Sequence, residues 1–303
     1  MSAPLYRLHA VDRVLELGAR PWLMGIVNAS PDSFSDGSPN ATLAERVQLA
    51  RELLAAGADI VDIGGESAST RRPPVTVEEE IERVVPLIER VVGELGATVS
   101  VDTYKPAVAR AAIAAGARIV NDVSGLRDPA LAELCARTGA ALVVMHTRAA
   151  PRERMQDPDL YEDILGEVLA NLGERVAVAL AAGMAREQLI VDPGPDFAKT
   201  PAQTIRLLVE LPRLHDLRLP LLMAISRKDF IGALTGRAPR ARLAGTLAAL
   251  AHGVDAGAHI FRVHDVSAAS DFLKVRAALS GQVVPSRDLA LAEELRYEPS
   301  TVE

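Results

Sequence analysis

Eight short apolar runs recur along the chain, and polar or charged residues follow each of them. The first run, residues 22–27, stops at Asn28 and opens into a polar loop that reaches Gly37. The others are residues 60–63 before Gly64, 99–101 before Asp102, 119–120 before Asn121, 142–145 before His146, 189–191 before Asp192, 221–225 before Ser226 and 260–261 before Arg262. Short apolar runs of this kind are typical of buried strands.

Segments with helical periodicity separate these runs. In residues 42–56, Thr42 and Glu45 have the spacing of a helix capping box. Further helices are expected at residues 106–115, 129–138, 161–182, 201–211, 241–256 and 266–279, with a short one at 228–234. The alternation of eight strands with helices predicts an α/β fold, a single-domain (β/α)8 TIM barrel over residues 22–280, whose active site lies at the carboxyl ends of the strands.

The two ends of the chain extend this barrel. Residues 5–17 alternate loosely between apolar and polar, which predicts a hairpin packed on the amino-terminal end of the barrel. Residues 1–21 are therefore assigned to that hairpin, and residues 281–303 to a polar tail that is either a loose last helix or frayed. No composition shift marks a linker between domains.

Composition narrows the class of protein. The chain has 303 residues, 49% of them hydrophobic, and a net charge of -7, which argues against a nucleic-acid-binding protein. A single cysteine, Cys135, cannot form an internal disulfide, so a reducing cytoplasm is the expected compartment. No apolar stretch has the length of a membrane span, and the first residues lack the apolar core of a signal peptide.

The polar residues at the strand ends divide into two groups. Ser226, Arg227 and Lys228 follow the seventh run, and Arg262 and His264 follow the eighth, where barrels frequently bind phosphate. The second group consists of Asp102, Asn121 and Asp192, whose carboxylate and amide groups suit a flat heterocycle with several N–H donors. The chain has no GxGxxG or P-loop motif and no zinc-ligand spacing.

Each of these residues also has a purely structural interpretation. Asp102 and Ser226 can cap helices, Asp192 can belong to a turn, and Arg262 can form an ordinary ion pair. Glu78, Glu79 and Glu80 are interpreted as favourable charges at a helix amino terminus. The functional interpretation is favoured because the structural one must hold independently at every strand end.

The motifs, taken together, resemble those of dihydropteroate synthase. They are Asn28-Ala29-Ser30-Pro31-Asp32-Ser33-Phe34-Ser35-Asp36-Gly37, Gly64-Gly65-Glu66-Ser67, Asp102-Thr103-Tyr104-Lys105, Asn121-Asp122, Met145-His146, Asp192-Pro193-Gly194 with Phe197-Ala198-Lys199-Thr200, Ser226-Arg227-Lys228 and Arg262-Val263-His264-Asp265. The resemblance covers residues 22–279, and eight motifs in order are highly specific. It implies an enzyme that joins (7,8-dihydropterin-6-yl)methyl diphosphate to 4-aminobenzoate, giving dihydropteroate and diphosphate.

The resemblance also implies roles for individual residues. The pterin positions are matched by Asp102, Asn121, Asp192 and Lys228, with Met145 and Phe197 along the ring. The diphosphate positions are matched by Ser226, Arg262 and His264, and Asn28 matches the position that meets a diphosphate-bound magnesium ion, Mg2+. The 4-aminobenzoate positions are matched by Ser30, Pro31, Asp32, Phe34, Ser35, Thr70 and an adjacent arginine. Catalytic roles fall on Asp32, Lys228 and Arg262. A homodimer is also expected, with neither nucleic acid nor a membrane as partner.

The chain departs from the family pattern at several positions. Ala68-Ser69 looks inserted in the second loop, so that Arg71 and Arg72 both become candidates for one role, and Arg71 is favoured because it directly follows Thr70. Ala224 and Asp196 replace glycines that are common in the family. Two other functions compete: methyl transfer from methyltetrahydrofolate on the same pterin site, and a silent pterin-binding paralogue. The first has no use for a 4-aminobenzoate site, and the intact cationic residues argue against the second.

Overall fold

The computed structural model describes residues 3–30, 41–66 and 73–296. Its strands are β1 (Tyr6–Ala10), β2 (Arg13–Leu17), β3 (Trp22–Asn28), β4 (Ile60–Gly64), β5 (Thr98–Asp102), β6 (Ile119–Asp122), β7 (Ala141–Met145), β8 (Leu189–Asp192), β9 (Leu222–Met223) and β10 (Ile260–Val263). Its α-helices are α1 (Leu43–Ala55), α2 (Val77–Leu95), α3 (Pro106–Ala114), α4 (Ala130–Thr138), α5 (Ile164–Ala181), α6 (Pro201–Val209), α7 (Asp229–Thr235), α8 (Leu243–Asp255) and α9 (Val266–Leu279).

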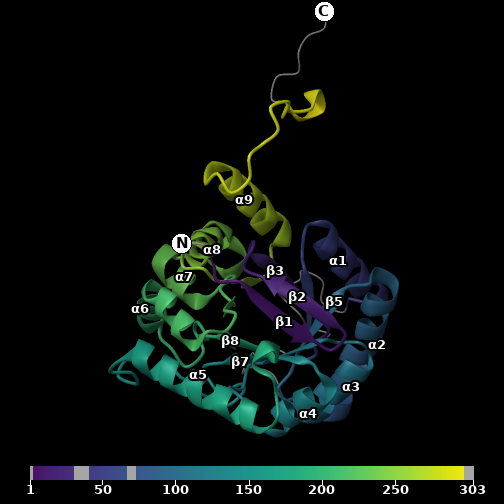
Figure 1. The fold of residues 1–303 in the computed structure, drawn as a ribbon, viewed down its shortest axis with the longest axis vertical. Coiled ribbons are helices and arrows are strands. Elements are labelled where there is room, and N and C mark those ends of the chain that lie inside the picture. The colour runs from purple at the N-terminus through teal and green to yellow at the C-terminus, as the bar shows by residue number, and fades with distance from the viewer. Residues whose placement is uncertain (1–2, 31–40, 67–72, 297–303) are drawn as a thin grey trace, which may run out of the picture.

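The last eight strands form one parallel sheet in the order β8-β7-β6-β5-β4-β3-β10-β9. An isolated parallel bridge between Val191 and Leu221 joins β8 to the β9 edge and brings the sheet almost to closure. The helices surround it, as Figure 1 shows. The predicted α/β barrel is therefore confirmed. No helix in the described part of the chain has the length and apolar character needed to cross a bilayer.

Local sequence explains where the helices begin. Thr42, Thr76 and Thr200 each accept a hydrogen bond from the backbone three residues on, completing capping boxes before α1, α2 and α6. The predicted helix over residues 161–182 starts later, at Ile164, because the Asp163 side chain caps it. The predicted helix over 201–211 ends at Val209, and a 3-10 segment, Leu211–Leu217, follows with a proline near its start.

The hairpin β1–β2 closes one end of the barrel. Leu8, Ala10, Leu15 and Leu17 of the hairpin are buried. They form one apolar cluster with inward-facing strand residues, which are Met24, Ile60, Ile119, Ala141, Val143, Ile190, Leu222 and Ile260. Figure 1 shows the hairpin lying across the barrel opening. The predicted hairpin is thus present, at the amino-terminal end of the strands.

One strand is shorter than the sequence prediction. β9 covers only Leu222–Met223, although residues 221–225 were expected to form the strand. The chain leaves the ladder early because the backbone turns towards Ser226 and Arg227, the latter with a φ of 60°. After α9, the described residues hold only a short 3-10 segment, Glu293–Leu295, and this part of the chain is exposed. It runs away from the barrel in Figure 1.

Candidate functional site

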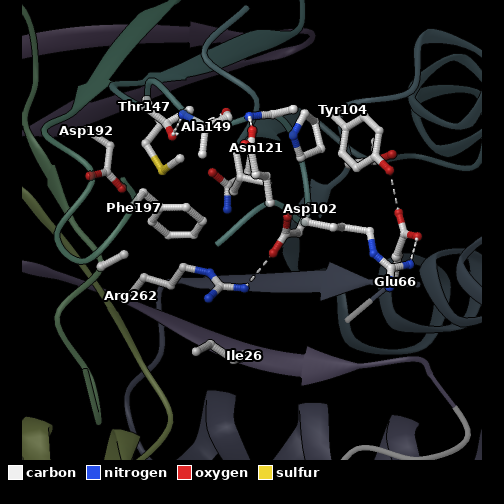
Figure 2. A pocket seen from close by; sticks show the side chains of 18 of the residues that line it. Ile26, Glu66, Asp102, Tyr104, Asn121, Thr147, Ala149, Asp192, Phe197 and Arg262 are labelled. Atoms are coloured by element: carbon white, nitrogen blue, oxygen red, sulfur yellow. Dashed lines mark hydrogen bonds and ion pairs between the residues drawn. The ribbon is translucent and has the colours of Figure 1, made fainter. Parts of the chain in front are cut away.

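A cavity of about 280 Å3 opens at the carboxyl ends of the barrel strands. The sequence-predicted residues that line it are Asp102, Asn121, Met145, Asp192, Phe197, Ser226, Lys228, Arg262 and His264. They come from the barrel strands or the loops that follow them. In Figure 2, Asp192, Asn121 and Asp102 lie around the Phe197 ring, and Arg262 reaches towards Asp102. Ala224, one of the departures from the family pattern, also lines the wall.

Arg262 links two carboxylates on neighbouring strands. Its Nε donates to Asp62 Oδ2 at 2.6 Å, and an Nη donates to Asp102 Oδ2 at 2.8 Å. Burial raises the pKa of Asp102 to about 7, although Arg262 acts in the opposite direction. Burial acts to lower the pKa of Arg262, but Asp62 and Asp102 outweigh it and raise that pKa. Arg262 therefore stays charged inside the cavity.

Asp62 was missed by sequence reasoning. It is fully buried within β4, and its Oδ2 also accepts a hydrogen bond of 3.3 Å from the Asn121 amide. Asp62 Oδ1 has no hydrogen-bond partner among the described residues. The available signal was a carboxylate inside the apolar run of residues 60–63, where a buried strand ordinarily carries none. Asp62 thus sets the orientation of two groups that face the cavity.

The Asp192 carboxylate lies at the end of β8 and is only 3% exposed. Its Oδ1 accepts a hydrogen bond of 2.7 Å from the Gly194 backbone N–H. Burial raises the pKa of Asp192 to about 6, against the lowering effects of that hydrogen bond and of Lys228. A ligand with N–H donors would stabilise the ionised form.

Lys228 extends into the cavity over an aromatic ring. Its Nζ lies 4.3 Å from the centroid of the Phe197 ring, a cation–π contact. Among the described residues no hydrogen bond to this ammonium group is formed, and burial lowers the pKa of Lys228. The group is therefore available to a ligand that lies between Phe197 and the strand ends.

Two of the predicted anion-binding residues, Ser226 and His264, contact each other. Ser226 Oγ lies 3.0 Å from His264 Nδ1 and accepts a hydrogen bond of 3.2 Å from the His264 backbone N–H. Arg227, which the sequence placed in the same group, forms an ion pair with Asp265 at 2.7 Å. Of these residues, Ser226, Lys228, Arg262 and His264 border the cavity.

A second polar cluster borders the cavity next to β4. Glu66 accepts hydrogen bonds from the Val75 backbone, Tyr104 and Arg152 at 2.8–2.9 Å. Lys105 lies between Glu66 and Glu80, 3.2 Å from one and 2.6 Å from the other. Glu80 lies in the first turn of α2, as expected from the sequence, and its buried side chain also forms the ion pair with Lys105. The Tyr104–Glu66 bond is drawn in Figure 2.

The connection between β7 and α5 also contributes, which the sequence analysis did not foresee. The lining residues from it are Thr147, Ala149, Ala150, Pro151, Arg152 and Glu153. Loops at this end of a barrel generally carry its function, so the unusual length of the segment between Met145 and the next helix was the available signal. The β7–α5 connection places Ala149, Ala150 and Pro151 next to Arg152, which binds Glu66.

The remaining predicted residues lie at the rim or outside the described part of the chain. Asn28 is the last residue of β3, paired in register with Gly64. Ser30 is buried, and its carbonyl accepts a hydrogen bond from Arg46. Those outside the described residues are Pro31, Asp32, Phe34, Ser35, Thr70 and Arg71, together with the insertion Ala68-Ser69.

Comparison with known proteins identifies the family. Residues 24–264 match the family model described as pterin binding enzyme. The chain is 39% identical to the dihydropteroate synthase of Escherichia coli strain K12, over 96% of this chain and 100% of that protein. The chain belongs to the dihydropteroate synthase family. The resemblance drawn from the eight motifs is thereby confirmed.

Solved structures of dihydropteroate synthases share this fold. The Xanthomonas albilineans protein, solved with 4-aminobenzoic acid, has a TM-score of 0.83 and 43% identity, covering 93% of this chain and 100% of its own. The Thermus thermophilus protein in complex with 6HMPPP has a TM-score of 0.77 and 38% identity, covering 90% and 99%. The chain is therefore an enzyme of this family.

Proposed function

We propose that this chain condenses (7,8-dihydropterin-6-yl)methyl diphosphate with 4-aminobenzoate, releasing diphosphate and forming 7,8-dihydropteroate for folate biosynthesis. The observation that carries the proposal is the cavity itself, in which buried carboxylates and an amide face an aromatic ring and two cations. Related enzymes have been solved with 4-aminobenzoic acid and with 6HMPPP.

The pterin occupies the inner part of the cavity in this proposal. Asp192 and Asp102 accept hydrogen bonds from the ring and amino N–H groups, and Asn121 can both donate and accept. The ring lies against Phe197 and Met145, with Lys228 donating to a ring acceptor. This assignment uses the groups whose hydrogen-bonding capacity the described residues leave unfilled, including the Lys228 ammonium.

The diphosphate lies towards the ends of β9 and β10. Arg262 supplies a fixed positive charge, and Ser226 and His264 supply hydrogen-bond donors. Asn28 offers one hard oxygen ligand that suits Mg2+, and no group of three or more acidic, histidine or cysteine ligands occurs in the described residues. Asn28 together with the substrate phosphates would hold Mg2+, which would supply positive charge beside the departing diphosphate.

Departure of diphosphate leaves positive charge on the pterin methylene carbon, which the ring delocalises. We assign stabilisation of that charge to the Asp32 carboxylate, while Lys228 and Arg262 stabilise the leaving group and orient the pterin. The neutral arylamine of 4-aminobenzoate then attacks the methylene carbon, and the acidic ammonium group so formed loses one proton to water, so no strong general base is needed. Ser30, Pro31, Phe34, Ser35, Thr70 and Arg71 form the 4-aminobenzoate site in this proposal.

A coupled assay with the pterin diphosphate, 4-aminobenzoate and Mg2+ tests the proposal directly. Formation of dihydropteroate with stoichiometric diphosphate supports it, and absence of product with a folded protein overturns it. Methyl transfer from methyltetrahydrofolate, measured in parallel, tests the competing chemistry. Calorimetry of the ligand-free protein with Mg2+ should show little heat, since a single neutral side chain is a weak ligand set.

We also propose a homodimer formed through α6–α8. An apolar groove runs between these helices, lined by Ile205, Phe230, Ile231, Ala248 and others. Val209 and Leu234 at its edge are 65% and 69% exposed. Light scattering should give twice the chain mass, and Leu234→Glu should shift the measured mass to that of the monomer.

We also propose a reducing, cytoplasmic compartment for this protein. Its Cys135 is buried and free, as expected for such a compartment.

A further inference from the structure

Lys199 is completely buried, and nothing in the proposed chemistry uses it. Its ammonium lies 2.8 Å from His146 Nδ1 and donates to the carbonyl oxygens of Gly194 and Phe197, each at 3.0 Å. The His146 carbonyl is a further acceptor at 3.3 Å. A lysine ammonium has three donors, and here every one of them has an acceptor.

Within the described residues, Lys199 forms no ion pair. No carboxylate of that part of the chain lies within ion-pair distance of Lys199, and burial lowers the pKa of this amine to about 7. A buried cation without a counter-ion is costly, and it persists here because its N–H groups pair with carbonyl oxygens that would otherwise be buried without a partner. We therefore look for the structural role of Lys199 in the backbone groups that it binds.

The loop that Lys199 ties down, residues 193–198, has an unusual backbone. Gly194, Asp196 and Ala198 all have positive φ, at 66°, 64° and 50°. A Cβ at Gly194 would lie 2.1 Å from the His146 carbonyl oxygen, so the loop touches the end of β7 directly. Non-glycine residues with positive φ are strained and persist only where the surroundings hold them.

The residues that Lys199 contacts also hold two groups that line the cavity, the Asp192 carboxylate and the Phe197 ring. The Gly194 peptide donates its N–H to the Asp192 carboxylate and accepts from Lys199 with its carbonyl. Phe197, whose carbonyl binds Lys199, presents the ring under Lys228. Figure 2 shows Asp192 and the Phe197 ring adjacent on one wall of the cavity.

We propose that Lys199 is a positioning residue that fixes the Asp192 carboxylate and the Phe197 ring by tying the β8–α6 loop to the end of β7. This rests on the proposed pterin site. It assigns to Lys199 no contact with substrate and no proton transfer. Its effect should appear in affinity for the pterin diphosphate, because the aromatic wall and the carboxylate would lose their relative position.

The test compares Lys199→Met with Gln188→Met. Gln188 is also buried and donates to two backbone carbonyls, those of Cys135 and Ala140, but at the start of β8, away from the cavity. Both variants should lower the melting temperature. Only Lys199→Met should raise Kd and KM for the pterin diphosphate, by tenfold or more, with kcat changed less than threefold and KM for 4-aminobenzoate unchanged at saturating pterin diphosphate.

A Kd within twofold of wild type in folded Lys199→Met, or equal losses in both variants, would overturn the proposal. If Lys199→Met does not fold, Lys199→Gln, which keeps two donors, should show an intermediate loss of pterin affinity, and wild-type affinity would refute it. Failure of the proposed function is distinguishable, since wild type would then form no dihydropteroate in the coupled assay, whatever the affinity of the Lys199 variants. A crystal structure of either Lys199 variant should still show Phe197 displaced, and an unmoved loop would refute the positioning role.

Discussion

The two ends of the barrel are built from the same strands but have opposite chemistry. Ile60 of β4 belongs to the apolar cluster under the hairpin, whereas Asp62, two residues later, binds Arg262. The same step of two residues is repeated in Ile119 and Asn121 of β6, Ile190 and Asp192 of β8, and Ile260 and Arg262 of β10. Side chains two apart in a strand face the same side, so both layers face the barrel interior.

Along the barrel axis, the residues that stabilise the fold are therefore separate from those proposed to act in catalysis. The amino-terminal layer is filled by the hairpin and is mainly apolar, while the carboxyl-terminal layer holds buried charges whose ionisation burial opposes. Substitutions in the first layer should therefore change stability alone. Substitutions in the second should mainly change catalysis, and some should increase stability.

The largest effect is expected for Arg262→Lys. Lysine keeps the charge but cannot present two N–H groups in a rigid plane to Asp62 and Asp102. Two charge-assisted hydrogen bonds contribute roughly 1.5–3 kcal/mol each, so kcat/KM for the pterin diphosphate should fall about a thousandfold. Steady-state kinetics measures this loss.

The matched control is Arg118→Lys at the opposite end of the barrel. Arg118 pairs with Asp12 of the hairpin turn at 2.6 Å, and the Asp12 side chain is 63% exposed. An exposed pair contributes about 1 kcal/mol or less, so kcat/KM should stay close to wild type. Similar losses in both variants would show that arginine replacement acts through general stability.

The sequence predicted the positions of the strands and of most groups in the upper layer, because each apolar run ends at a polar residue. It did not single out Asp62, because this residue precedes the strand end, although a carboxylate inside the apolar run of residues 60–63 was a visible signal. Contacts such as Arg152 with Glu66, which are 86 residues apart, depend on how the loops pack and have no local signal. Lys199 was missed because a lysine next to a helix start is ordinarily assigned to the surface.

Leu8→Ala should give the next largest effect, confined to the amino-terminal layer. Leu8 is 1% exposed within the hairpin cluster, and truncation of such a buried leucine costs about 2–5 kcal/mol of unfolding free energy. Urea unfolding should show this loss while kcat/KM remains within twofold of wild type. Leu5→Ala, at a residue 77% exposed, is the control and should change neither quantity. A fall in kcat/KM for folded Leu8→Ala would break the separation between the layers.

Asp192→Asn tests the opposite layer with two effects of opposite sign. The amide keeps an oxygen that can accept from the Gly194 N–H but loses the charged hydrogen bonds proposed for the pterin, worth roughly 1.5–3 kcal/mol. Pterin diphosphate affinity should therefore fall about ten- to a hundredfold, measured by calorimetry. Unchanged affinity would mean that Asp192 serves only the turn.

The stability effect of Asp192→Asn is smaller and depends on pH. The folded pKa of Asp192 is raised to about 6 from its usual 3.8, so this carboxyl contributes stability below pH 3.8 that is lost as the pH rises through 6. The ligand-free wild type therefore bears the full cost of ionisation at pH 8 and only part of it at pH 5, while the amide bears none. The melting temperature of the variant relative to wild type should rise between these pH values by about 2–4 °C, corresponding to about 1 kcal/mol. A difference that is the same at pH 5 and pH 8 would show that the buried carboxylate carries no ionisation cost, and the contrast between the two layers would then rest on Arg262 alone.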